Sequence, residues 1–189
     1  MKLMFSGCYS LSNLNISNFD TSLVEYMDSL FYDCYNLTSL DLSMFNTRSL
    51  TNMEYMFSGC HSLSYLNMEN FNTKLVTKMN YAFSDCWNLK NLNVSGFDTK
   101  KVINMEYMFY NDYNLESLDL ANFITNQVTN MNYLFANCSN LLSLELSYFN
   151  STIATIEGIF ENSLKLENII SHDEKICEMK PSGAQCGPN

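Results

Sequence analysis

The sequence predicts an α/β solenoid, a single stack of short repeats with one parallel β-sheet along one side and short helices along the other. Three observations indicate this fold. The 189 residues divide into segments of 26 in which like residues recur, and self-similarity at such a period is typical of solenoids. Each segment contains one stretch of helical spacing followed by one stretch of alternating spacing. Apolar residues make up 47% of the chain, which is enough for one continuous core.

We number the residues of each repeat from its first residue, which is position 1. About six and a half repeats begin at residues 1, 27, 53, 79, 105, 131 and 156 and fill residues 1–170, and residues 171–189 form a separate end segment. Position 5 is phenylalanine in every repeat: Phe5, Phe31, Phe57, Phe83, Phe109, Phe135 and Phe160. Further apolar ladders at positions 1, 11, 14, 16 and 19 complete the predicted core.

Each repeat is expected to begin with a short helix. In repeat 3, Met53, Met56, Phe57 and Cys60 follow helical spacing. Position 7 is Gly, Asp or Asn throughout, and these residue types best tolerate the left-handed conformation that ends helices. The sequence therefore predicts one or two helical turns that stop at position 7.

A strand over positions 13–17 follows, because apolar residues at positions 14 and 16 alternate with polar ones. A turn comes next at Asp-Thr or Asn-Thr pairs such as Asp20-Thr21 and Asn46-Thr47, where the side chain can bond the backbone two residues on.

The outward-facing strand residues are the first candidate binding surface. They comprise position 15, which is Asn15, Asp41, Asn67, Asn93, Asp119 and Glu145, together with Tyr65 at position 13. The alternative is a solvated sheet face. A second candidate is an aromatic stripe at position 3, made of Tyr55, Tyr81, Tyr107 and Tyr133. These rings can form a binding surface or merely cover the helical side.

Five cysteines share position 8 and are predicted to pack as small buried hydrophobes. A linear array of thiols cannot enclose a metal tetrahedrally, so no metal site and no cofactor are expected. Cys177 and Cys186 lie outside the repeats and can close the C-terminal end by a disulfide in an oxidising compartment, or remain free. Near the two histidines, His61 and His172, no nucleophile or orienting acid departs from the repeat pattern. No enzyme activity is therefore expected.

The net charge of −10 disfavours nucleic acid and anionic membranes as main partners. No apolar run is long enough to cross a bilayer. The charge is uneven, because residues 104–174 hold ten acids and one base. In contrast, Arg48, Lys74 and Lys100 share position 22 and Lys101 follows directly. This locally basic edge can steer a partner, or it can serve solvation alone.

The repeat from Met53 to Thr73, with its Leu63-x-x-Leu66-x-Met68 core, resembles the 26-residue repeat of BspA-like leucine-rich repeat surface proteins, which is also found in Mycoplasma-type lipoproteins. The resemblance covers residues 1 to about 170. It implies a leucine-rich-repeat-like solenoid at the cell surface or outside the cell, with a binding role and no catalysis. The chain departs from the family in lacking a signal peptide, a lipobox or an anchor. Because Met1 already occupies position 1, the chain is expected to be a fragment that begins inside a repeat.

Two functions are therefore expected. The first is a non-enzymatic adhesion or interaction module that binds a protein or glycan through its repeat surface. The second is a structural spacer or stacking unit of a longer repeat protein, which associates end to end through its first repeat. The apolar residues of that repeat are Met4, Phe5, Leu11, Leu14 and Ile16.

Overall fold

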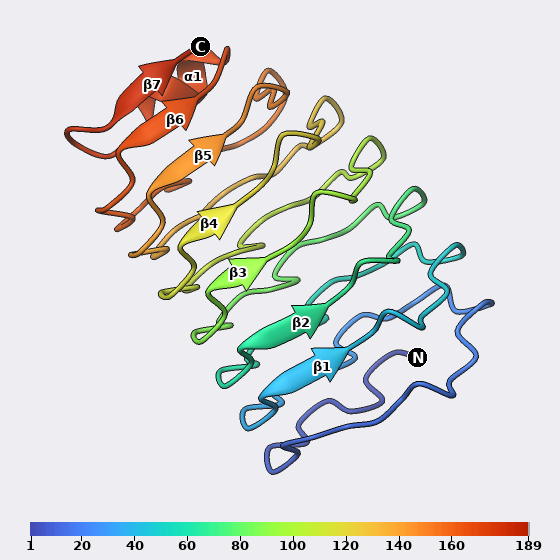
Figure 1. Ribbon diagram of the computed structural model, residues 1–189. Coiled ribbons are helices and arrows are strands. Elements are labelled where there is room, and N and C mark those ends of the chain that lie inside the picture. Colours follow the sequence, from blue (N-terminus) through green and yellow to red (C-terminus); the bar gives the residue numbers. More distant parts are fainter. Residues whose placement is uncertain (189) are drawn as a thin grey trace.

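The computed structural model describes residues 1–188 as successive turns of chain stacked side by side (Figure 1). Six short strands lie in line along one side, all pointing the same way. They are β1 (Ser39–Asp41), β2 (Tyr65–Asn67), β3 (Asn91–Leu92), β4 (Ser117–Leu118), β5 (Ser143–Glu145) and β6 (Asn168–Ile170). The C-terminal segment adds the helix α1 (Glu174–Glu178) and the strand β7 (Gln185–Gly187). None of the described helices has the length and apolar character needed to span a bilayer.

The strands pair in parallel at equivalent positions, as Ser39 with Tyr65 and Ser143 with Asn168. They form three small sheets, β1–β2, β3–β4 and β5–β6–β7. The expectation of one sheet with strands over positions 13–17 is therefore wrong in its extent. Each strand has only two or three residues. In repeats 1 to 5 a position-15 side-chain oxygen accepts from the N–H of position 17, for example Asp41 Oδ1 from Ser43 N at 2.9 Å, so in these repeats that N–H is not available to extend the strand pairing.

The predicted helices are absent from residues 1–170, and the prediction is wrong. Positions 1–8 form consecutive turns instead. Tyr55 has a φ of 55° and Gly59 a φ of 78°, and the equivalent positions of the other repeats are also left-handed. A right-handed helix cannot pass through a left-handed residue. The left-handed conformation expected at position 7 is confirmed, but position 3 shares it and prevents any helix from forming.

Hydrogen bonds between repeats replace those of a helix. In repeat 3, Tyr55 N donates to Asn80 O at 3.1 Å and Phe57 N donates to Ala82 O at 2.9 Å, both in the next repeat. The intervening Met56 N donates within its own repeat, to Met53 O at 3.2 Å. In repeats 2 to 7 the apolar residues at positions 1, 4, 5 and 8 still point inward, because the alternating turns return to the core at these positions. The apolar spacing therefore fits both a helix and this chain of turns.

The core consists of ladders of similar apolar side chains, and the position-5 ladder is phenylalanine throughout. Neighbouring position-5 phenylalanine rings stack with centroids 5.4 to 5.9 Å apart, and Phe83 at the centre is fully buried. Threonines at position 21 are also buried and bridge successive repeats. Thr47, for example, donates from Oγ1 to Asn72 O at 3.2 Å and accepts from Asn72 N at 2.7 Å. The turn predicted beside these threonines is confirmed, since Asp20 Oδ1 accepts from Ser22 N at 3.0 Å.

Candidate functional site

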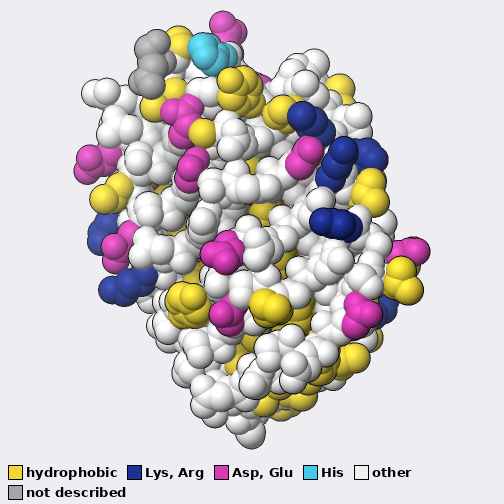
Figure 2. Space-filling view, turned by 45° about the vertical axis from the view of Figure 1, so that its right-hand side comes forward, with side chains coloured by type: hydrophobic (Ala, Val, Ile, Leu, Met, Phe, Trp, Pro, Cys, Tyr) yellow, Lys and Arg dark blue, Asp and Glu magenta, His cyan; other side chains and the backbone are white. Residues whose placement is uncertain are grey.

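The outward-facing strand residues form the candidate site, which we call the sheet face. The structure places position 15 of each repeat on one side of the stack, with Asn15, Asp41, Asn93 and Asp119 exposed. Asn67 and Glu145 on the same side are partly buried. Figure 2 shows a molecular surface that is largely uncharged, with scattered acidic side chains. The alternation of buried and outward positions follows from the two-residue period of extended chain.

Most of these side chains are held in place before any partner arrives. The Oδ1 atom of position 15 accepts from the backbone N–H of position 17 in repeats 1 to 5, at 2.9 to 3.2 Å. In repeat 6, Glu145 accepts from the Ser147 hydroxyl through Oε1. The Ser43 backbone N–H, together with the Ser43 hydroxyl, lowers the pKa of Asp41, so this side chain stays a carboxylate at neutral pH. A fixed side chain loses little conformational entropy on binding.

The sheet face is hollowed beside Tyr65. The hollow has a volume of about 330 Å³ and is lined by Asn13, Leu14, Asn15, Ser39, Leu40, Asp41 and Tyr65. Tyr65 is 55% exposed, and the other repeats carry only Asn or Ser at this position. The structure thus brings three of the predicted residues, Asn15, Asp41 and Tyr65, around one hollow. Asn67, Asn93, Asp119 and Glu145 lie along the face but outside this lining.

Leu14 is a member of the lining that the sequence pattern did not indicate. Position 14 belongs to a core ladder, and Leu40 and Leu66 are buried as that ladder predicts. Leu14 is partly exposed, since no described strand covers its outer side. The ladder gives position 14 the same role in every repeat, and the sequence set Leu14 apart only as one of the apolar residues through which repeat 1 was expected to associate, not as part of a binding surface.

The predicted aromatic stripe has its ring faces covered. Tyr55, Tyr81, Tyr107 and Tyr133 stack with centroids 4.6 to 4.9 Å apart and planes within 14° of parallel. Each inner ring contacts a neighbour on both sides, so only ring edges and hydroxyls remain for a partner. Gly158 ends the row at position 3 of repeat 7, where a Cβ would collide with the Tyr133 ring. This geometry favours the structural interpretation, in which the stripe covers the turns.

A second aromatic row at position 9 encloses His61. The ring lies between Tyr35, with centroids 4.6 Å apart, and Trp87, with centroids 3.6 Å apart, both within 5° of parallel. Burial between these rings lowers the pKa of His61. Its ring faces are therefore occupied by packing.

A family comparison can now be set beside this geometry. The family described as "Mycoplasma protein of unknown function, DUF285" matches residues 1–67 and 61–173, which together are most of the chain. The chain belongs to this family. The predicted membership in the BspA-like leucine-rich repeat proteins, with their Mycoplasma-type repeat, is thereby confirmed. No curated protein matches the chain.

Two solved structures are similar to this family member. A leucine-rich repeat protein from Bacteroides ovatus is 14% identical, with a TM-score of 0.34 over 85% of this chain and 57% of that chain. The T. pallidum leucine-rich repeat protein is 14% identical, with a TM-score of 0.42 over 88% of this chain and 63% of that chain. This DUF285 chain spans less than two thirds of the length of either structure.

Four of the five position-8 cysteines of this DUF285 chain are buried as neutral thiols, but the prediction of burial is wrong for Cys8, which is exposed in repeat 1. Cys34, Cys60, Cys86 and Cys138 are buried, and each donates to a position-5 carbonyl of the preceding repeat at 3.0 to 3.3 Å. Burial raises the pKa of Cys34 to about 11 and raises those of the other three well above the usual value. A protonated thiol is a poor nucleophile and a poor metal ligand. No group of three or more His, Cys, Asp or Glu suited to a metal occurs in residues 1–188.

Asp112 replaces cysteine at position 8 of repeat 5 and is fully buried. Its Oδ1 accepts from Cys86 N at 2.9 Å, but its Oδ2 has no partner among the described residues. Burial raises the pKa of Asp112 well above its usual value. A protonated carboxyl carries an O–H group that can donate a hydrogen bond. At the same position of repeat 7, the Ser163 hydroxyl donates to Phe135 O at 2.6 Å. The raised pKa thus follows from packing within the core.

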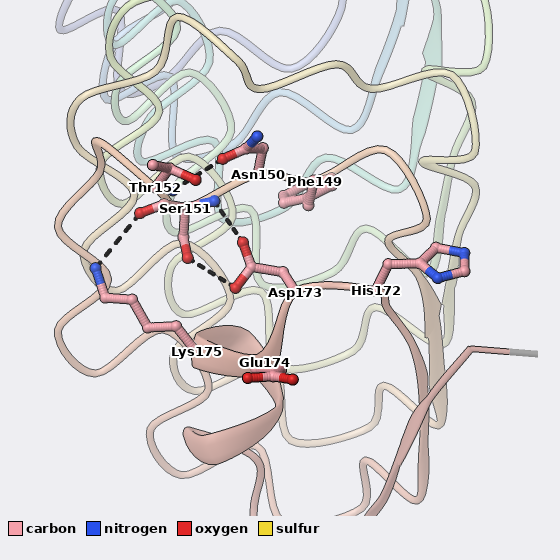
Figure 3. A pocket seen from close by; sticks show the side chains of 8 residues that line it. All are labelled: Phe149, Asn150, Ser151, Thr152, His172, Asp173, Glu174 and Lys175. Carbon is pink, nitrogen blue, oxygen red and sulfur yellow. Dashed lines mark hydrogen bonds between the residues drawn. The ribbon is translucent and has the colours of Figure 1, made fainter.

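The C-terminal segment closes the stack through side-chain and disulfide links. The Asp173 carboxylate accepts from Ser151 N at 2.5 Å and from Ser151 Oγ at 2.9 Å (Figure 3). It also accepts from Ile176 N at 3.1 Å and so caps α1. The Sγ atoms of Cys177 and Cys186 are joined at 2.03 Å, which links α1 to β7. Ser151 and Asp173 also line a hollow of about 450 Å³, in which the Asp173 carboxylate is already engaged.

Proposed function

We propose that this chain is a non-enzymatic interaction module of a surface or extracellular protein, which binds a protein or glycan partner through its sheet face. The hollow beside Tyr65 carries this proposal. A half-exposed aromatic ring stands there among amide, hydroxyl and carboxylate groups, and the rest of the face is small and polar. Tyrosine in such a setting offers a large contact area together with a polar tip.

The side chains around Tyr65 favour binding because they are already held in fixed positions. Asn15 and Asp41 each accept a hydrogen bond from the backbone N–H of the residue two positions later, so that a partner need not order them. Few residues carry most of the affinity of an interface, and tyrosine is among the most frequent of them. We therefore expect affinity to depend mainly on Tyr65 and only weakly on the outlying Asn93.

The test is binding of the purified chain to an array of immobilised extracellular-matrix proteins and surface glycans. For the strongest ligand found, Tyr65→Ala should lower affinity by about tenfold or more. Tyr113→Ala is the matched control, because Tyr113 is 40% exposed at position 9, outside the sheet face, and it should change affinity little. The triple variant Asn67→Lys, Asn93→Lys and Asp119→Lys should also weaken binding. Unchanged binding by both sheet-face variants would contradict the proposal.

A second candidate function is that of a stacking unit in a longer repeat array. It is supported by the apolar side chains of repeat 1, where Leu3 is 50% and Met4 52% exposed and Phe5 is partly exposed. Apolar surface of this kind favours association. Ile16, which was expected in the same apolar set, is buried and does not contribute. Sedimentation velocity across a concentration range, with and without reductant, should then show association that reductant does not change. A monodisperse monomer at every concentration would exclude this function for residues 1–189.

A further inference from the structure

A row of exposed cations runs along the turns that follow the strands, away from the sheet-face hollow. We call Arg48, Lys74, Lys100 and Lys101 the basic edge. All four side chains are exposed, and none of them forms an ion pair within residues 1–188. Figure 2 shows several Lys and Arg side chains close together near its right-hand margin. We propose that the basic edge binds a linear acidic polysaccharide, independently of any partner on the sheet face.

The fold sets the spacing of these charges. Position 22 carries Arg48, Lys74 and Lys100 in three consecutive repeats. Each of their backbone N–H groups donates to the position-20 side chain two residues earlier, at 3.4, 3.1 and 3.1 Å. The three side chains therefore start from equivalent points that are about one strand spacing, or 4.8 Å, apart. Asp98 is the neighbouring acid, and its Oδ1 already accepts from Lys100 N.

A repeating anion fits a repeating row of cations. In an extended polysaccharide that carries a carboxylate or sulfate on every sugar, the charges recur at about the length of one sugar ring, which is close to the rung step of about 4.8 Å. Several weak contacts then form in one binding event, and each new contact is intramolecular. A single small anion gains only one exposed ion pair, which contributes little. The basic edge is also a local exception in a chain of net charge −10, so a polyanion is attracted to this edge and repelled elsewhere.

The surroundings of the basic edge favour a polysaccharide over other polyanions. Proteins that bind single-stranded nucleic acid present aromatic rings for base stacking, but Phe45, Phe71 and Phe97 of the same turns are buried in the core. An anionic membrane is a broad surface, and juxtamembrane basic clusters contact it with many cations. The basic edge is a single line with one extra lysine. Its shape therefore matches a chain better than a plane.

The experiment measures binding of the intact chain to immobilised dextran sulfate, with uncharged dextran as the reference, over a range of salt concentrations. The basic-edge variant is Lys74→Ser, Lys100→Ser and Lys101→Ser. The matched control is Lys90→Ser, Lys165→Ser and Lys180→Ser, which changes the net charge by the same amount elsewhere. We expect salt-sensitive binding to dextran sulfate only, reduced about tenfold or more in the first variant and much less in the control. Thermal melts of both variants check that they fold.

Other results would overturn the proposal. Equal losses in the two triple variants would mean that diffuse charge binds the polymer. Equal or tighter binding to single-stranded oligothymidine or to phosphatidylserine vesicles would assign the basic edge to nucleic acid or to a membrane. Absence of binding to dextran sulfate at low salt would also overturn it. The sheet-face variant Tyr65→Ala should bind dextran sulfate normally, which separates a failure here from a failure of the proposed function.

Discussion

The two ends of the stack differ in how their outermost repeat is completed. At the C-terminal end, Asp173 bonds Ser151 where a further repeat would otherwise supply the partners, and buried Ile176 covers the core. In repeat 1, Phe5 and Leu14 remain partly exposed. The polar groups and the apolar side chains of each repeat are thus satisfied and covered by the neighbouring repeat or, at the C-terminal end, by the end segment that replaces it. Stability in such a stack is set by nearest-neighbour contacts, and this dependence can be tested position by position.

The largest expected loss of stability comes from the phenylalanine ladder, tested at the centre of the stack and in repeat 1. Phe83→Ala should lower the free energy of unfolding by about 3–5 kcal/mol, because the ring is fully buried between two neighbours. Phe5→Ala removes the same group from the partly exposed repeat 1 and should cost about 1–2 kcal/mol. Urea denaturation of both variants provides the comparison. Equal losses would show that repeat 1 is as well covered as the centre.

Removal of the Asp173 carboxylate, which replaces the next repeat at the C-terminal end, should cause the next largest loss of stability. Asp173→Ala deletes three hydrogen bonds to a charged acceptor, including the N-cap of α1. We expect a loss of about 2–4 kcal/mol, measured as unfolding free energy and as faster hydrogen exchange in β7. The control is Asp20→Ala in repeat 1, whose carboxylate accepts only a local bond from Ser22, with a loss below about 1 kcal/mol.

Opening the Cys177–Cys186 disulfide should weaken the same end by a similar or slightly smaller amount. The bridge closes a short loop between α1 and β7, and chain-entropy arguments give about 2–3 kcal/mol for a loop of this length. Cys177→Ser with Cys186→Ser should lower the melting temperature and make it insensitive to reductant. Cys8→Ser is the control, since Cys8 is free and exposed. Equal melting temperatures for the wild type and the double variant would contradict the expectation.

The smallest predicted change concerns Asp112 inside the stack. Burial raises its folded-state pKa above the unfolded value of about 3.9. The folded chain therefore binds the proton more tightly, and stability falls as the pH rises between the two pKa values. Asp112→Ser, which copies Ser163, should stabilise the chain by about 1–2 kcal/mol at neutral pH and by less near pH 4. Melting curves at several pH values check this, and parallel pH profiles for variant and wild type would refute it.

Repetition made much of the core predictable. The ladders of Phe83, Leu63 and their equivalents in repeats 2 to 7 are buried as expected, because a residue type repeated at a fixed period has the same neighbours in each inner repeat. The helix prediction failed at position 3. There Tyr55 and Tyr81 adopt a left-handed conformation that tyrosine rarely takes alone. Bonds to the next repeat and ring stacking hold that conformation, and neither is visible within a single repeat.

The candidate site was predictable only in part. Position 15 was placed on the outer face by its alternation with buried apolar residues, and Tyr65 was included in this face at position 13, but nothing in the pattern marked it as the centre of a hollow. The hollow itself depends on the exposure of Leu14, which follows from the tertiary environment of repeat 1 and not from its residue type.

The sequence by itself determined the family, the period of the stack, the identity of the core ladders and the outward direction of the sheet face. These features follow from local alternation and from repetition. The tertiary structure decided that turns replace helices and that Asp173 completes the C-terminal end. The physical reason is that these features depend on hydrogen bonds between repeats or with the end segment, such as Tyr55 N to Asn80 O. A backbone group takes the partner that folding brings to it, and here that partner lies about 25 residues away.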